Sequence, residues 1–148
     1  MVPRSDVPRS KFATTHTHKT TFRPSALVPI YVDEVLPGDS FYGEVTMFIR
    51  MATPLFPIMD NIYAETFFFF VPNRLVWDNW VKMMGERAAP GDSIDFQVPQ
   101  KPAWNNNDAT GFDEYSLGDY FGLPIKGECV DGNVYVNALP FRAYNLIS

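Results

Sequence analysis

Hydrophobic and polar side chains alternate along the middle of the chain, and this alternation predicts a β-strand with one buried face. Over residues 41–51 the odd positions carry Phe, Gly, Val, Met, Ile and Met, whereas the even positions carry Tyr, Glu, Thr, Phe and Arg. Because successive side chains of a strand point to opposite faces, this period places the odd positions on one face. We therefore expect a strand over 41–51 whose odd face meets the core.

A second strand is predicted over 61–71, and its character changes along its length. The first half has one polar, solvent-facing side, formed by Asn61, Tyr63 and Glu65, whereas the second half is apolar on both faces. Such a strand enters the interior, with one face on an opposing sheet and the other covered by a loop, a helix or another subunit. An ordinary core strand without an interface role is the alternative. The candidate core or subunit-interface residues are Phe67, Phe68, Phe69 and Phe70.

The residues that flank these strands carry edge and turn signals. Within LVPIYVDEVLPGDSF at 27–41 we expect a short apolar strand, and Pro29 inside it favours a sheet edge because proline cannot donate to the ladder. The LPGD sequence at 36–39 predicts a turn, since Pro sets φ at the second position and Gly accepts positive φ at the third. The prolines of residues 53–60 predict an irregular connection.

After Pro72 the spacing of apolar residues changes from that of a strand to that of a helix. The helical stripe consists of Trp77, Trp80, Val81 and Met84. Asn73 is suited to cap the start of this helix, and Gly85 is suited to close it. Trp77 and Trp80 are further candidates for the core or a subunit interface, and the helical stripe by itself explains both.

The last third of the chain is predicted to be irregular with short helices. Residues 86–111 have a loop-like composition, residues 116–124 predict a short helix with a Ser cap and a Gly stop, and residues 131–133 predict a hairpin turn. A final helix places Leu139, Ala143, Leu146 and Ile147 on one face. That face is still running at Ser148, so we expect the chain to be a truncated piece of a longer one.

Composition supports a globular, mainly β protein. Hydrophobic residues make up 46% of the chain, and 13 Phe and 13 Pro among 148 residues favour strands over long helices. The single cysteine, Cys129, excludes an intrachain disulfide and a cysteine-rich zinc site. His16 and His18 would share a strand face, but two ligands do not form a metal site, so no metal is expected.

Charge is distributed unevenly between the N-terminus and the rest of the chain. Residues 1–23 carry five basic side chains and one acidic one, a net +4, whereas residues 24–148 carry seven basic and sixteen acidic ones, a net −9. We therefore divide the chain into a basic, extended N-terminal arm over 1–25 and a body over 26–148. The arm's basic residues are candidate nucleic-acid contacts, with an ordinary solvated terminus as the alternative. They are Arg4, Arg9, Lys11, Lys19 and Arg23.

Catalytic motifs are missing from the sequence. It contains no Gly-rich phosphate loop, no nucleophile elbow and no helical metal-binding motif. No apolar run approaches the roughly 18 residues that a membrane helix requires. We therefore expect a protein that is not an enzyme, uses no cofactor and does not bind a membrane.

Four segments together resemble the N-terminal portion of the major capsid protein of Microviridae, particularly of the gokushovirus branch. They are HTHKTTF at 16–22, LVPIYVDEVLPGDSF at 27–41, ATPLFPIMDNIYAETFFFFVPNRLVWDNW at 52–80 and LPFRAYNLI at 139–147. The resemblance covers nearly the whole chain. Because members of that family are several times longer, it implies that residues 26–148 are the N-terminal part of a jelly-roll capsid domain.

What this resemblance implies is a structural role. The family's capsid protein is an eight-stranded jelly-roll β-sandwich with long loop and short-helix insertions. Its pentamers build a T=1 icosahedral capsid around single-stranded DNA, together with other virion proteins. The expected location is therefore the virion, assembled in the cytoplasm of the bacterial host.

Two alternatives to a capsid subunit remain open from the residues alone. A small β-rich module that binds single-stranded nucleic acid would be a soluble monomer with salt-sensitive DNA affinity. An enzyme on a sandwich fold would need a ligand-sized pocket with convergent polar groups. A capsid fragment instead predicts concentration-dependent assembly or insolubility.

Overall fold

The computed structural model describes residue 8 and residues 10–93, 96–104, 111–127 and 133–148. The chain divides into two compact units, each built from two separate stretches. The first unit contains Met1–Val32 and Gln100–Asn137, and the second contains Asp33–Pro99 and Ala138–Ser148. Each unit therefore needs residues from both halves of the chain.

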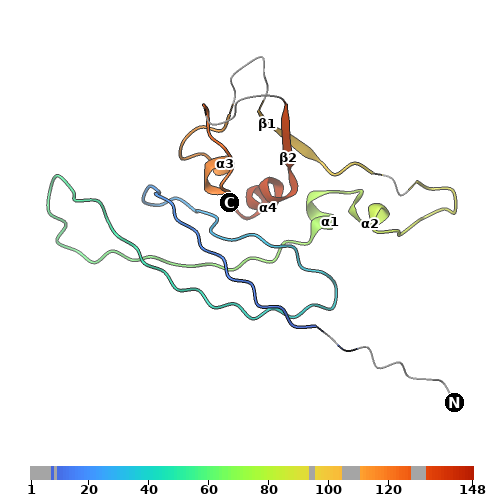
Figure 1. The fold of residues 1–148 in the computed structure, drawn as a ribbon, viewed down its shortest axis with the longest axis horizontal. Coiled ribbons are helices and arrows are strands. Elements are labelled where there is room, and N and C mark those ends of the chain that lie inside the picture. The colour runs from blue at the N-terminus through green and yellow to red at the C-terminus, as the bar shows by residue number, and fades with distance from the viewer. Residues whose placement is uncertain (1–7, 9, 94–95, 105–110, 128–132) are drawn as a thin grey trace. The chain divides into compact units, whose positions relative to one another are not determined.

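The first unit contains a two-stranded antiparallel sheet. Strand β1 (Gln100–Trp104) pairs with β2 (Val134–Asn137), with Pro102 opposite Tyr135 and an irregularity in register between Pro102 and Trp104 (Figure 1). The prediction that residues 86–111 form a loop is therefore wrong for β1. Pro102 argued against a strand here, because proline is excluded from central strands. Both strands of a two-stranded sheet are edge strands, however, and edge strands tolerate proline.

Helix α3 (Leu117–Tyr120) follows the predicted start and stop. Ser116 occupies the N-cap position but makes no capping hydrogen bond through its side chain. Gly122 has φ +75°, and its N–H donates to the carbonyl of Asp119 at 2.8 Å, while the N–H of Leu123 donates to the carbonyl of Gly118 at 3.0 Å. These two bonds form a Schellman motif, which confirms the glycine stop.

Close packing around Gly118 fixes α3 in the first unit. Gly118 is buried, and a Cβ built on it would overlap the ring of Phe112. We expect Gly118→Ala to destabilise the protein by about 1–3 kcal/mol, because an added methyl group would force the ring or the backbone to move. The midpoint of urea denaturation would measure this destabilisation.

Gly91→Ala is the matched control for this prediction. Gly91 has ordinary φ, and a Cβ built on it has no neighbour within 4 Å. The control should therefore leave the midpoint nearly unchanged. Equal midpoints for the two variants would contradict the packing described for Gly118.

The described residues of the second unit form three helices. Helix α1 (Asn73–Val76) and helix α2 (Trp80–Met83) replace the single helix predicted after Pro72. The break falls at Trp77, whose backbone is extended (φ −153°, ψ 112°) and whose side chain is 8% exposed. A stripe of apolar residues predicts that side chains share one side, and it does not require that every residue between them be helical.

The ends of these short helices agree only in part with the prediction. Asn73 is the first helical residue rather than the cap, because Pro72 takes the N-cap position. Gly85 closes α2 as predicted: it has φ +96°, and its N–H donates to the carbonyl of Lys82 at 3.0 Å. The N–H of Glu86 reaches the carbonyl of Val81 at 3.0 Å, which completes a second Schellman motif.

Helix α4 (Leu139–Ile147) is the predicted final helix, and it packs against α1. Its buried residues are Leu139 and Phe141, whereas Leu146 is exposed. Of the predicted apolar face, Leu139 is buried and Ala143 and Ile147 are half-buried, whereas the buried Phe141 was not part of that prediction. The guanidinium of Arg142 donates to the carbonyl of Val76 at 3.0 Å, so α4 supplies a partner to a carbonyl at the end of α1.

A pair of extended segments, 41–51 and 61–71 with their connection 52–60, makes up much of the second unit. We call residues 41–71 the aromatic hairpin, and Figure 1 draws it in teal to green. The two segments lie side by side where the hydroxyl of Thr66 meets the sulfur of Met47 at 3.6 Å. No backbone–backbone hydrogen bond forms within residues 41–71, all of which the structure describes.

The predicted strand that contains Pro29 and the predicted strands over 41–51 and 61–71 are therefore not strands of a sheet in this structure. Alternation predicts an extended segment and its two faces, but a strand also needs a partner for its backbone groups. The turn over 36–39 is confirmed, since Gly38 has φ +87° and the N–H of Asp39 donates to the carbonyl of Leu36 at 3.1 Å. The few short helices and the small antiparallel sheet are consistent with a mainly β protein.

Candidate functional site

The aromatic hairpin carries the most prominent exposed apolar surface of the described residues. Phe68 and Phe70 are 78% and 76% exposed, and Phe67 and Phe69 are 57% and 52% exposed. The rings of Phe67 and Phe69 stack with centroids 6.2 Å apart, as expected for alternate residues on one face. The four phenylalanines are therefore not covered by the rest of the chain.

The other extended segment of the hairpin shows the predicted difference between its two faces. On residues 41–51 the odd position Met47 is 47% exposed, whereas the even positions Tyr42 and Phe48 are 94% and 91% exposed. The odd face is thus partly covered, and the even face is almost completely open. The alternation in sequence corresponds to an alternation in environment, although neither face is buried.

Exposed surface of this extent is unusual for a protein that acts as a monomer. Among the described residues no side chain is fully buried, and the buried hydrophobic ones are few: Trp77, Ala103, Tyr120, Ala138, Leu139 and Phe141. Large exposed apolar patches mark surfaces that bind protein, membrane or ligand, or that aggregate.

The two tryptophans predicted from the helical stripe lie inside the second unit. Trp77 is buried, Trp80 is half-buried, and their rings meet edge to face with centroids 6.3 Å apart. This geometry is typical of aromatic pairs that stabilise a core. The structure thus gives Trp77 and Trp80 a packing contact with each other within the second unit.

The basic arm is only partly within the described residues. Arg4 and Arg9 lie outside them, and Lys11, Lys19 and Arg23 are exposed. The guanidinium of Arg23 lies over the ring of Tyr115 at 5.4 Å from its centroid, in cation–π geometry. The structure does not bring Lys11 and Lys19 into this contact.

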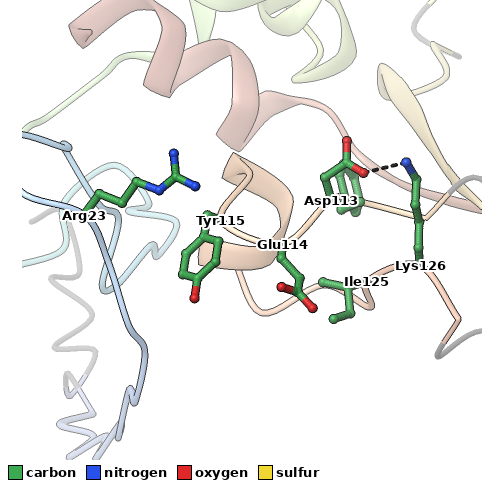
Figure 2. Close-up of a pocket in the computed structure, with 7 residues that line it drawn as sticks. Arg23, Asp113, Glu114, Tyr115, Ile125 and Lys126 are labelled. Carbon is green, nitrogen blue, oxygen red and sulfur yellow. Dashed lines mark hydrogen bonds and ion pairs between the residues drawn. The ribbon is translucent and has the colours of Figure 1, made fainter. Parts of the chain in front are cut away.

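Arg23 also lines a hollow of about 500 Å³ in the first unit. Figure 2 shows Arg23 beside Tyr115 on one side and the ion pair of Lys126 with Asp113 on the other. The remaining lining residues are Phe112, Glu114 and Ile125. Its two positive and two negative side chains balance, and the Lys126–Asp113 pair is largely exposed.

This hollow was not predicted from the sequence. Apart from Arg23, its residues come from two stretches that a parallel bridge between Phe112 and Ile125 brings together. The signal in the sequence is weak, because the bridge has no alternating strand pattern around it. Its side chains offer no nucleophile with an adjacent base and no cluster of donors for an oxyanion, so the hollow does not suggest catalysis.

The two histidines of the arm are described and close together. The rings of His16 and His18 stack with centroids 6.3 Å apart, and the ring of His16 lies 5.3 Å from that of Tyr31. Across the described part of the chain, no three potential metal ligands gather at one place. Cys129 and most of the predicted turn at 131–133 lie outside the described residues.

Helix length also bears on the question of membranes. The longest helix that the structure describes is α4, with nine residues. Within the described ranges no helix has the length and apolarity needed to cross a bilayer.

Comparison with known proteins identifies the family. A sequence profile described as capsid protein (F protein) matches residues 1–148, the full length of the chain. The chain belongs to this capsid protein family. This finding confirms the resemblance to Microviridae capsid proteins that the sequence motifs indicated.

The chain is similar to three phage capsid proteins, each named capsid protein VP1. It is 44% identical over 146 residues to that of Bdellovibrio phage phiMH2K, and 45% identical over 152 residues to that of Chlamydia phage 1, with 99% of the chain covered in both cases. Identity to the protein of Spiroplasma virus 4 is 34% over 148 residues, with 97% covered. The chain spans about a quarter of the length of these relatives, 26%, 24% and 25% respectively.

Proposed function

We propose that this protein is a structural capsid subunit whose aromatic hairpin joins it to other protein in the shell. The exposure of Phe67–Phe70 in a member of a capsid protein family carries this proposal. Subunits of a shell must cover apolar surface by contact with their neighbours. The names of the similar phage proteins support a structural role rather than an enzymatic one.

The finer architecture follows from the same proposal. Residues 26–148 supply the first strands of a jelly roll, in which one edge of segments 41–51 and 61–71 pairs with strands from the remaining length found in the relatives, and the other edge stays open to neighbouring copies. The unpaired backbone of the aromatic hairpin supports this arrangement, since such edges require partners. Pentamers of the subunit then form a T=1 icosahedral shell, with other virion proteins, in the cytoplasm of the bacterial host.

Sedimentation velocity over a range of protein concentrations tests the structural role. Association that grows with concentration, with the aromatic hairpin protected from hydrogen exchange in the associated form, is the expected result. A soluble monomer at every concentration would overturn the proposal. Such a monomer would leave the nucleic-acid-binding module as the better explanation.

A second role, in contact with packaged single-stranded DNA, is supported by the net +4 charge of residues 1–23 and by the exposure of Lys11 and Lys19. Binding to phosphate groups releases counterions and makes affinity depend on salt. Replacing the five basic residues of the arm with Ala should weaken binding of oligo(dT). It should also flatten the plot of log affinity against log salt by about 0.7 for each phosphate that the variant no longer binds.

Fluorescence anisotropy at several salt concentrations measures this slope. Lys82→Ala, which removes an exposed cation on α2, is the matched control and should leave the slope unchanged. If the arm variant keeps the slope of the unmodified protein, the arm does not contact DNA.

A further inference from the structure

We propose that the basic arm of one copy of this chain docks as an added strand on the aromatic hairpin of a second copy. The arm segment concerned is residues 10–22. This inference rests on the proposed function, because it names the contact through which two copies associate. It is argued from the backbone, the side-chain pattern and the charge of the two segments.

The arm segment has the unpaired backbone and the residue types that strand addition requires. All of residues 10–22 are described, and they form no backbone–backbone hydrogen bond. Seven of these residues are Thr or His, and the threonines favour extended conformations. Lys11 and Lys19 occupy odd positions, whereas Phe12 and Phe22, 85% and 48% exposed, occupy even ones. An extended arm therefore presents cations on one face and aromatic rings on the other.

The aromatic hairpin offers the complementary features. Its backbone is unpaired, which is the condition for an extended peptide to add a strand through main-chain hydrogen bonds. Its phenylalanines give apolar surface for the rings of the arm. Glu44 and Glu65 are exposed, one on each extended segment, and neither forms an ion pair within the described part of the chain.

The charges of the two regions are opposite. Residues 41–71 carry three acidic side chains and one basic one, Arg50, for a net −2, against the net +2 of residues 10–22. Opposite charges steer the encounter and set its register. One chain thus carries both surfaces of the contact, the arm segment and the aromatic hairpin, and both are exposed. Two copies can exchange arms reciprocally, which is the self-complementary arrangement of a two-fold dimer.

Arg23 is excluded from this contact. Its guanidinium lies over Tyr115 within the first unit, so it holds the base of the arm rather than reaching a second copy. The cations left for the hairpin are Lys11 and Lys19, which form no ion pair with any described residue. Single-stranded DNA is also anionic and would bind the same two lysines. The test must therefore distinguish binding to DNA from binding to the aromatic hairpin.

A charge-exchange experiment tests the contact. The variants are Lys11→Glu with Lys19→Glu, Glu44→Lys with Glu65→Lys, and the combination of all four, each studied by sedimentation velocity at low salt. We expect each double variant to weaken association by roughly tenfold, since two attractive pairs become repulsive. The fourfold variant should recover most of the affinity, because its charges are again opposite.

The matched control reverses two exposed cations elsewhere in the second unit. Arg74→Glu with Lys82→Glu changes net charge as the arm variant does, and it should leave association unchanged. Failure of the fourfold variant to recover association would overturn the inference. An arm variant that loses oligo(dT) binding but associates normally would also overturn the inference, because the arm would then contact DNA and not a second copy.

The outcomes also separate this inference from the proposed function. If the unmodified chain associates and every charge variant associates equally, the arm contact is wrong and the structural role stands. If the unmodified chain does not associate at any concentration, both are wrong.

Discussion

Replacing Phe68 and Phe70 with Ser is expected to abolish concentration-dependent association while leaving each unit folded. Both rings are more than three-quarters exposed, so their removal costs the single chain little. In an associated form each ring contributes about 1.5–3 kcal/mol of burial. Removal of both therefore weakens association by at least about a hundredfold on that scale. Light scattering against concentration measures the effect, and far-ultraviolet circular dichroism checks the fold.

Two exposed leucines outside the aromatic hairpin provide the control. Leu75 on α1 and Leu146 on α4 are 61% and 55% exposed. Replacing both with Ser removes comparable apolar surface and should leave association largely intact. If the leucine variant loses association as fully as the phenylalanine variant does, general hydrophobicity rather than the aromatic hairpin drives association.

Trp77→Ala should give the largest loss of stability. Trp77 is the largest of the buried side chains described, and it lies at the break between α1 and α2. Truncating a buried tryptophan costs about 3–5 kcal/mol, because it removes transfer free energy and leaves a cavity. Because few other side chains are buried, the remaining packing offsets little of this loss of stability. We expect α1 and α2 to lose fixed structure, measured as a lower urea midpoint and a weaker near-ultraviolet circular dichroism signal.

Trp80→Ala is the informative comparison for Trp77→Ala. Trp80 is half-buried and meets Trp77 by its edge, so its removal should cost clearly less. Equal losses of stability for the two variants would show that the pair acts as one unit. A smaller loss for Trp77→Ala than for Trp80→Ala would contradict the burial described for Trp77.

Local signals in the sequence predicted local structure well. The turn at 36–39 and the glycine stops at Gly85 and Gly122 depend on residues within one turn of each other. Glycine alone adopts positive φ without strain, so its position marks these ends directly. The alternation over 41–51 likewise predicted which face is the more covered.

Pairing and burial were harder to predict, because they depend on distant residues. Strand β1 lies in a stretch that reads as a loop, and it exists through its pairing with β2. Trp77 and Trp80 share a predicted helical stripe, yet the helix breaks between them so that Trp77 is buried. Of the candidate contact residues, the phenylalanines are open and Arg23 is engaged by Tyr115, which no pattern in the arm indicated.

The hydrogen bond between Arg142 and Val76 has a consequence for synthesis on the ribosome. The two residues are 66 positions apart, and α1 packs against α4. Chain growth proceeds at about 5–20 residues per second, so α1 waits roughly 3–13 s for α4 to be synthesised. The aromatic hairpin precedes α1 and is exposed throughout that time. The nascent chain therefore exposes its phenylalanines before α1 and α4 are able to pack.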